Sequence, residues 1–166
     1  LDRSSAASDV YKRQLLKVHE VAATWFHQQL EEPAGRRVKE QLTNRGISPT
    51  TAKTLQLGFA PHGNENLKKY LQAQGFSQSV LLRSGLVVER NYGQNVDRFR
   101  GRLMIPICRE TGTSFAFGGR AIAPDQQPKY LNSPETPIYN KSSTLYGLNL
   151  TKTAIRQKGF AVLVEG

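Results

Sequence analysis

The sequence is poor in cysteine and contains no long apolar run. Its one cysteine, Cys108, excludes an internal disulfide, which fits the reducing environment of the cytoplasm. No apolar stretch approaches the roughly 18 residues that a membrane span needs. The first residues also lack the apolar core of a secretory signal. We therefore expect a cytoplasmic protein with no membrane partner.

Several familiar catalytic patterns are missing as well. No CxxC or HxxxH pair is present, so the sequence predicts no metal site. His19 and His27 lie near one face of a predicted helix, where packing explains them better than metal binding. The pair Gly118-Gly119 lacks the continuation GK[ST], which excludes a phosphate-binding loop of the Walker type. A glycine pair within a strand instead indicates a bulge or a close approach of the backbone.

Positive charge, by contrast, is abundant. The 166 residues include 23 Lys and Arg against 13 Asp and Glu, which gives a formal net charge of +10. This excess favours a polyanionic partner such as nucleic acid, although a basic protein without such a partner can have the same composition. Because no run of five or more basic residues occurs, folding must assemble any binding surface.

The first half of the chain has the pattern of a helical region. Apolar residues from Leu15 to Leu30 recur at helical spacing, and shorter helices follow, two of them after the capping residues Ser48 and Ser77. The predicted helical segments cover residues 15–30, 34–43, 49–55, 64–74 and 77–83. Residues 1–14 have neither a helical nor a strand period. We expect a non-native or linker segment there and exclude it from the fold.

The second half has the pattern of β-strands, and Gly112 suits a hairpin turn between two of them. The predicted segments are strands at 86–90, 102–108 and 114–122, a loop at 128–148, a helix at 149–158 and a buried parallel strand at 160–166. We expect the first three strands to form an antiparallel meander and Asn149 to cap the helix. The expected fold class is α+β, with a helical first half, an antiparallel meander and a long basic loop.

Three arginines recur at a spacing of two. In an extended segment, Arg98, Arg100 and Arg102 would face the same way and could hold successive phosphates. Spacing alone favours the alternative of a solvated strand face, with Asp97 and Glu110 as ion-pair partners. We keep Arg98 and Arg100 as candidate DNA contacts.

Three sequence blocks in the second half carry a family resemblance. They read DRFRGRLMIPI at residues 97–107, FAFGGR at 115–120 and PKYLNSPETPIYNKSSTLYGL at 128–148. In order and spacing they resemble the catalytic core of the bacterial DnaG-type DNA primases, the enzymes that lay RNA primers at replication forks. The resemblance weakens in the helical half. It departs from the family in the turn CRETGTS, which lacks the usual basic residues, and in one extra residue within the loop APDQQ.

This resemblance implies roles for individual residues. Arg120, Lys129 and Lys141 match a basic ridge that guides single-stranded template DNA toward the active site. Tyr130 matches an aromatic residue beside the lysine and suits stacking on a base or nucleotide, whereas a loop tyrosine that covers the core is the alternative. Glu165, at the end of the run VLVEG, matches the catalytic glutamate of the first strand of the Toprim fold, which primases share with topoisomerases.

The resemblance also implies domain limits and cofactors. It places the N-terminal subdomain of the catalytic core at residues 15–157 and the start of a truncated Toprim domain at 158–166. The family's metal-binding aspartates, which hold Mg²⁺ or Mn²⁺, would lie beyond Gly166, and its zinc-binding module would lie before Leu15. We therefore expect this chain alone to bind template and to make no primer.

The predicted function is thus part of a DNA primase, a nucleotidyltransferase that acts as a DNA-directed RNA polymerase. Its expected partners are single-stranded DNA, ribonucleoside triphosphates and, through regions absent from this chain, the replicative helicase. Two alternatives stay open. One is a nucleic-acid-binding module of a non-primase Toprim protein or phage helicase–primase, and the other is a basic structural domain with no nucleic-acid role.

Overall fold

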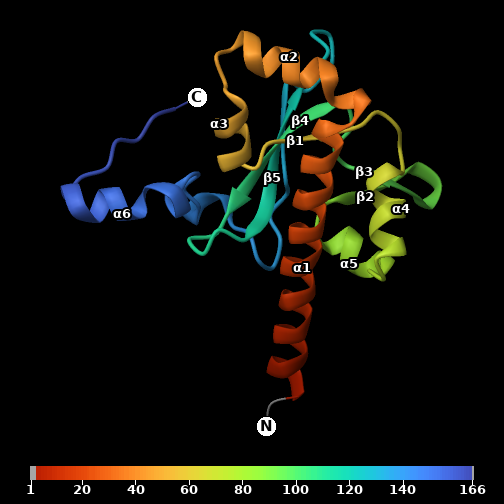
Figure 1. Ribbon diagram of the computed structural model, residues 1–166. Coiled ribbons are helices and arrows are strands. Elements are labelled where there is room, and N and C mark those ends of the chain that lie inside the picture. The colour runs from red at the N-terminus through yellow and green to blue at the C-terminus, as the bar shows by residue number, and fades with distance from the viewer. Residues whose placement is uncertain (1–2, 166) are drawn as a thin grey trace.

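A four-stranded antiparallel sheet forms the centre of the molecule. The computed structural model describes residues 3–165, with the side chains of residues 5–165. The strand order is β1-β4-β5-β6, formed by Gly58–Ala60, Arg102–Cys108, Ser114–Ala121 and Tyr130–Asn132. Helix α1 (Arg3–Glu31) runs along this sheet (Figure 1). The strands predicted around residues 102–108 and 114–122 are therefore confirmed.

Helix α1 packs an apolar stripe against the sheet, at the predicted helical spacing. Its buried members include Leu15, Val18, Ala22, Phe26 and Leu30. Phe26 meets Phe117 of β5 edge to face, with ring centroids 5.2 Å apart. A Cβ on Gly58 of β1 would lie 2.7 Å from the backbone carbonyl carbon of Phe26. Glycine is therefore required where β1 passes the helix.

Helix α1 begins well before its predicted start at Leu15. The chain is helical from Arg3, and Tyr11 packs against the core with its ring 5.4 Å from the guanidinium carbon of Arg83. The predicted start is therefore wrong. An established helix propagates through good helix formers without needing an apolar period, so the pattern gave no sign of this extension. That residues 1–14 are non-native stays a prediction, and the first two lie outside the described residues.

Short helices follow α1, and their caps are those expected. They are η1 (Pro33–Gly35), α2 (Arg36–Asn44), α3 (Pro49–Thr54), α4 (Asn66–Ala73) and α5 (Gln78–Arg83). The Ser48 hydroxyl accepts the N–H of Thr51 at 3.1 Å, and the Ser77 hydroxyl accepts that of Val80 at 3.3 Å. Within the described part of the chain, no helix is long and apolar enough to cross a membrane.

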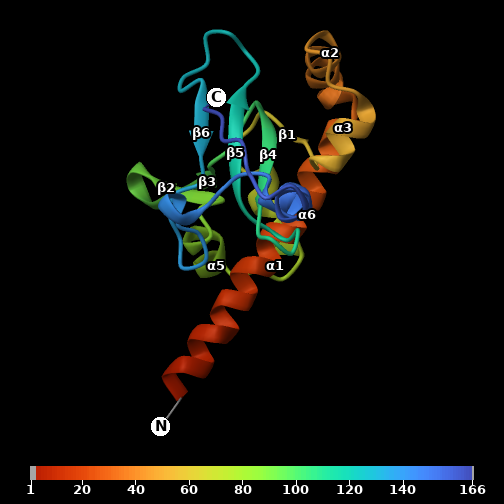
Figure 2. The same cartoon turned by 90° about the vertical axis from the view of Figure 1, so that its left-hand side faces the viewer.

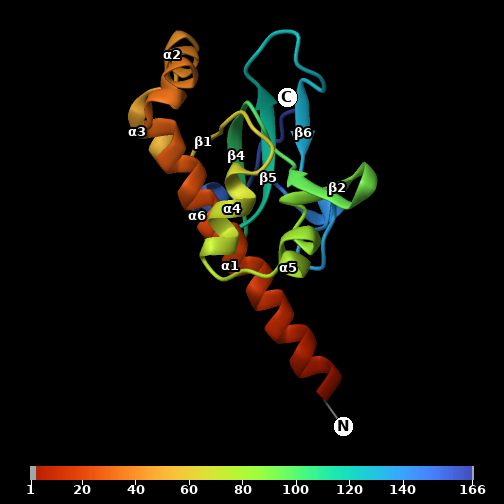
Figure 3. The same cartoon turned by 90° about the vertical axis from the view of Figure 1, so that its right-hand side faces the viewer.

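A separate two-stranded sheet replaces one strand of the predicted meander. Strand β2 (Val87–Arg90) pairs with β3 (Gln94–Asp97) rather than with β4, and η2 (Asn91–Gly93) joins them. Helices α4 and α5 lie between this small sheet and α1 (Figure 3). An antiparallel meander is confirmed, but it consists of β4, β5 and β6. The predicted place of residues 86–90 in this meander is wrong, because the alternation of a short strand does not specify its partner.

Asp97, at the end of β3, caps helix α4. Its carboxylate oxygens accept the N–H groups of Leu67 and Lys68, both at 2.8 Å. A carboxylate at this position satisfies free N–H groups and complements the helix dipole. Burial raises the pKa of Asp97, and these hydrogen bonds oppose that rise. Asp97 therefore stabilises the fold and is not an ion-pair partner of the arginines that follow it.

The glycine pair of β5 permits a close approach, which is one of the two predicted roles. The irregularity in the pairing of β4 with β5 falls instead at Ile107 and Cys108. A Cβ on Gly119 would lie 2.9 Å from the ring of Phe99 and 3.0 Å from the side chain of Arg102. Glycine therefore makes room for both side chains across the sheet.

The predicted loop from Pro128 to Leu148 is partly a strand. Its first residues form β6, the edge strand that pairs with β5, and Ser133 is fully buried with its hydroxyl accepting the N–H of Phe117 at 2.9 Å. A short turn, η3 (Lys141–Ser143), follows. The sequence did not predict this strand, because it is only three residues long and its polar residues are typical of an exposed edge strand.

Helix α6 (Leu148–Lys158) lies to one side of the sheet (Figure 1). It ends at Gly159 as predicted, but Gly147 rather than Asn149 occupies its N-cap, without a side-chain cap. Residues 160–165 form no strand, and their apolar side chains are exposed. The predicted buried strand is therefore wrong for these residues. A strand needs a hydrogen-bonded neighbour, and no described strand pairs with this segment.

His19 is a core residue of α1, which confirms its predicted packing role. Its ring is fully buried, stacks on Phe117 with centroids 5.8 Å apart and places Nδ1 2.7 Å from the Leu15 carbonyl oxygen. Burial lowers the pKa of His19 from 6.5 to about 4, so the imidazole is neutral near pH 7. His27 is half-buried, with Nδ1 2.7 Å from the Leu57 carbonyl oxygen.

Candidate nucleic-acid interface

Two cations and one aromatic ring meet where β5 ends and β6 begins. Arg120 and Tyr130 are paired across the two strands, and Lys129 precedes Tyr130. The guanidinium carbon of Arg120 and the Nζ of Lys129 each lie 5.8 Å from the centroid of the Tyr130 ring. Tyr130 is 59% exposed, so it does not cover the core. The structure thus brings three of the predicted residues together on the surface.

A further cation, Arg45, belongs to the same surface. A hydrogen bond from Arg120, together with its charge, lowers the pKa of the Tyr130 hydroxyl, and the charges of Lys129 and Arg45 add to this effect. Arg45 follows helix α2 and is exposed. Sequence reasoning missed it because the only local signal is the helix end at Gly46, which says nothing about distant neighbours.

A cavity of about 580 Å³ lies between the end of α2 and the loop of residues 121–129 that joins β5 to β6. Its lining is Gln41, Asn44, Arg45, Arg120, Ala121, Ile122, Ala123, Pro124, Gln126, Gln127 and Lys129. Figures 1 and 2 place α2 and this loop at the same end of the molecule. The lining contains three cations and four side-chain amides but no carboxylate. Such a hollow attracts anions and offers hydrogen bonds to a polar ligand.

Arg102 is buried beneath this loop and shapes it. Its side chain is inside the protein, and Nη1 donates to the carbonyl oxygens of Pro128 at 2.8 Å and Gly119 at 3.4 Å. The predicted row of three outward arginines is therefore wrong for Arg102. A spacing of two gives the face of a strand but not which face is buried. Because Pro128 directly precedes Lys129, the hydrogen bond from Arg102 supports the cationic surface from below.

The loop of residues 121–129 is also tied down at other points. The N–H of Ala121 donates to the Lys129 carbonyl at 2.9 Å, which closes the ends of the loop. Nε2 of Gln126 donates to the Arg100 carbonyl at 2.8 Å. These bonds fix the backbone from which Lys129 projects, so little ordering is required when a ligand binds.

The remaining arginines of the row use only part of their donor capacity. Arg98 donates through Nε and Nη2 to the Asn132 carbonyl, at 3.2 and 2.8 Å, and Arg100 donates through Nη1 to Oδ1 of Asn64 at 2.7 Å. Partial burial lowers the pKa of both guanidinium groups, which stay charged. Their contact with DNA stays a prediction.

Lys141 lies apart from the cluster around Tyr130. It opens η3, is exposed, and its backbone N–H donates to Oε1 of Glu135 at 3.3 Å. The side chain of Asn140 fixes this turn by accepting the Ser142 N–H at 3.0 Å. No contact between Lys141 and the Tyr130 cluster occurs among the described residues. The predicted basic ridge therefore has one compact part and one separate lysine.

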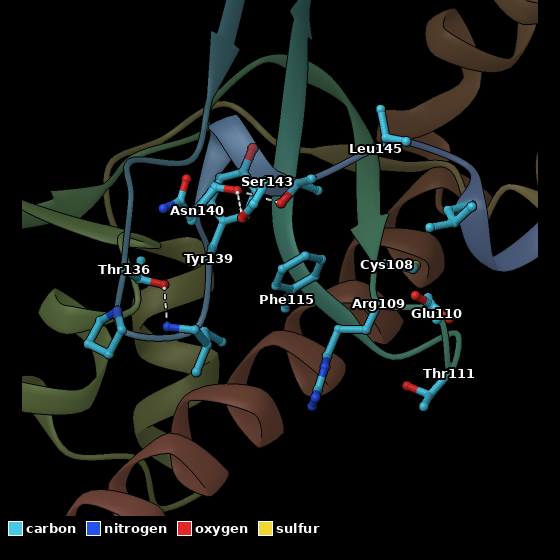
Figure 4. A pocket seen from close by; sticks show the side chains of 14 residues that line it. Cys108, Arg109, Glu110, Thr111, Phe115, Thr136, Tyr139, Asn140, Ser143 and Leu145 are labelled. Carbon is cyan, nitrogen blue, oxygen red and sulfur yellow. Dashed lines mark hydrogen bonds between the residues drawn. The ribbon is translucent and has the colours of Figure 1, made fainter. Parts of the chain in front are cut away.

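A second hollow, of about 630 Å³, lies between the turn that joins β4 to β5 and residues 136–148 (Figure 4). Phe115 and Tyr139 form its aromatic floor, with ring centroids 5.3 Å apart and nearly perpendicular planes. Arg109 and Glu110 stand on its rim and offset each other's charge. The hollow therefore lacks the uniform positive charge of the first cavity.

Glu165 lies in the extended segment after α6. Its side chain is exposed and forms no hydrogen bond or ion pair with another described residue, and Gly166 lies outside the described residues. Between residues 3 and 165 no group of three or more His, Cys, Asp or Glu side chains is placed to hold a metal ion. These residues therefore do not fit the divalent cations that polymerisation needs.

Comparison with known proteins assigns the family. Residues 25–152, most of the chain, match the family described as DNA primase catalytic core, N-terminal domain. The chain belongs to this family. The primase domain is 43% identical over 158 residues to the DNA primase of Synechocystis, a match that covers 93% of the chain and 25% of that protein. The match to the DNA primase of Streptomyces coelicolor is 42% identical over 92% of the chain and 24% of that protein.

Solved primase structures share the fold of the primase domain. The RNA polymerase domain of Mycobacterium tuberculosis DnaG, in complex with double-stranded DNA that has a 6-nucleotide overhang, matches with a TM-score of 0.88 and 36% identity. That match covers 93% of this chain and 48% of the other. A DnaG catalytic domain bound to single-stranded DNA matches with a TM-score of 0.83 and 33% identity, over 88% and 47%. The chain spans about a quarter of the length of the DNA primases of Synechocystis and Streptomyces coelicolor.

Proposed function

We propose that this domain grips single-stranded template DNA as part of a DNA primase that makes RNA primers for replication. Ribonucleoside triphosphates and the replicative helicase are the further partners that this role implies. Mg²⁺ or Mn²⁺ would be held by residues other than those described, and Glu165 would contribute a catalytic carboxylate. Residues 158–166 would lead into the Toprim domain.

One observation carries the proposal: the cluster of Arg45, Arg120, Lys129 and Tyr130 beside a cavity without carboxylates. Binding of single-stranded DNA uses two elements. One is a set of cations placed along the phosphates of the DNA, and the other is an exposed aromatic ring on which a base can stack. Membership of the primase core family and the DNA-bound relatives support the same role. We propose Lys141, Arg98 and Arg100 as flanking contacts.

Binding of a thymidine oligonucleotide about 12 nucleotides long tests this function. We expect binding at about 50 mM salt that weakens steadily as salt rises, because each phosphate contact on a single strand adds about 0.7 to the logarithmic salt slope. With three or four contacts the slope is about −2 to −3. Fluorescence anisotropy over a salt series measures it, and an absence of binding at low salt would leave the basic structural domain as the better description.

The same proposal predicts that the 166 residues make no primer by themselves. Polymerisation requires metal ions to neutralise the triphosphate and activate the attacking hydroxyl, and the described residues hold no group able to bind them. An assay with single-stranded template, radiolabelled ribonucleoside triphosphates and Mg²⁺ should give only background, with a complete bacterial primase as positive control. A primer of defined length from this chain would show that the metal site has been placed wrongly.

A further inference from the structure

The turn between β2 and β3 carries a tyrosine that the fold does not use. Tyr92 is the most exposed of the large apolar side chains in the described residues, with a relative exposure of 105%. Its side chain forms no hydrogen bond and no ring contact with another described residue. Figure 1 shows the turn projecting on the right-hand side of the molecule. The ring is therefore available to a partner outside the fold.

The backbone of Tyr92 is in an unfavourable conformation. Its φ of 66° and ψ of 27° lie in the left-handed region, where a bulky side chain is disfavoured and glycine is not. No contact of the Tyr92 side chain within the described residues compensates for this cost. Such an outlier favours a role in binding over a role in stability.

Arginines beside this turn lie close to one another. Burial, and next the charge of Arg90, lowers the pKa of Arg100, while Asp97 opposes this shift. Burial, followed by the charges of Arg100 and Arg98, likewise lowers the pKa of Arg102. None of these arginines forms an ion pair with a carboxylate among the described residues. Neighbouring like charges repel each other, so anions such as phosphates would stabilise this surface.

The exposed carboxylate of the hairpin is on the opposite face from Arg90. Arg90 pairs with Gln94 across the two strands, and Glu89 pairs with Asn95. Successive side chains of a strand point to opposite faces, so Glu89 and Arg90 diverge. A Cβ on Gly93 would lie 4.0 Å from Oε1 of Glu89, which places this carboxylate at the turn backbone. Glu89 therefore leaves the charge of Arg90 free to meet an anion.

The same arginines connect the hairpin with the cluster around Tyr130. Arg98 donates to the carbonyl of Asn132, the last residue of β6, and β6 begins at Tyr130. The carbonyl of Arg100 accepts from Gln126 in the loop that leads to β6. Figures 2 and 3 both show the β2–β3 hairpin beside the lower end of β6. Cations therefore lie between the two exposed tyrosines.

We propose that Tyr92 is a second stacking platform for single-stranded DNA, occupied by a base of the same strand that stacks on Tyr130. This inference rests on the proposed template-binding function. The phosphates between the two bases lie along Arg98, Arg100 and Arg90. A tyrosine ring suits this role because every base has a flat face, so stacking does not depend on sequence.

Two substitutions separate the ring of Tyr92 from its backbone. Tyr92→Gly removes the ring and suits the left-handed conformation, whereas Tyr92→Phe keeps the ring. With a thymidine strand of about 15 nucleotides, we expect Tyr92→Gly to bind about fivefold more weakly and Tyr92→Phe to bind within about twofold of the original chain. With a strand of about 4 nucleotides, held mainly at the cluster around Tyr130, Tyr92→Gly should bind like the original. Anisotropy titrations at low salt measure these affinities.

Phe160→Gly is the matched control. It removes an exposed aromatic ring that follows α6, on the opposite side of the sheet from the hairpin in Figure 1, and should leave both affinities unchanged. Melting curves verify that each variant folds. Full binding of the long strand by Tyr92→Gly would overturn the inference and leave template binding in place. An equal loss for both strand lengths, or an equal loss in Tyr92→Phe, would also overturn it. No binding of either strand by the original chain would instead remove the proposed function.

Discussion

Replacing Arg120 and Lys129 together by alanine is expected to weaken binding of single-stranded DNA about 30-fold at low salt. Each substitution removes a charged hydrogen-bond donor to phosphate, worth about 1 kcal/mol on an open surface. Both cations also lie 5.8 Å from the ring of Tyr130 and hold it at the edge of the sheet. The logarithmic salt slope should fall in magnitude by about 1.4, since two single-strand contacts are lost. Anisotropy titrations at several salt concentrations give both values.

Lys17→Ala/Lys69→Ala provides a charge-matched control for this experiment. Both lysines are exposed, on α1 and α4. Lys17 is paired with Glu20 of α1, and Lys69 with Glu65, the residue before α4. The control should lose little affinity, and neither double variant should change the free energy of unfolding by more than about 1 kcal/mol. If the control lost as much affinity as the Arg120/Lys129 variant, net charge rather than this surface would explain binding. If the Arg120/Lys129 variant instead lost most of its stability, the role of these two residues would be structural.

Acid is expected to destabilise the domain through His19. The pKa of this histidine is lowered by burial from 6.5 to about 4, so below pH 6.5 the unfolded chain takes up a proton that the folded chain refuses. The contribution of His19 to the free energy of unfolding is therefore fully present above pH 6.5. It falls as the pH drops toward 4 and levels off below that pH. Linkage makes the total loss about 3 kcal/mol. Urea unfolding at pH about 7 and about 5 measures a little over half of this loss.

Comparison with His19→Gln isolates this contribution, because carboxylates titrate in part of the same range. The variant loses the titrating ring, so its free energy of unfolding should fall less between the two pH values, whatever its absolute stability. His62→Gln, which removes an exposed histidine, is the matched control for the substitution itself. Parallel pH profiles for the original chain and His19→Gln would contradict the argument.

Local signals in the sequence predicted the helical half well. The serines before α3 and α5 and the glycine after α2 act within one turn, so a short window contains the whole cause. The pairing of β2 with β3 was not predictable in this way. It depends on which strand lies alongside, and several partners fit the same alternation. The apolar run after α6 shows the same limit, because a strand exists only with a neighbour.

The residues of the candidate site also differ in whether local sequence predicts them. Arg120, Lys129 and Tyr130 could be predicted because they belong to short blocks that resemble a known family. Arg45 could not, because folding alone brings the end of α2 next to β6. Arg102 was placed on the wrong side, since its partners are backbone carbonyls that no sequence pattern reveals.

The buried guanidinium of Arg102 has a consequence for how this surface can evolve. It anchors the base of the loop at Pro128, next to Lys129, while Gln127 and the residues before it form the outer curve. Insertions in the outer curve can reshape the amide-lined wall without displacing the cations. The cations can therefore keep their arrangement while the wall of the cavity beside them changes shape with the length of this loop.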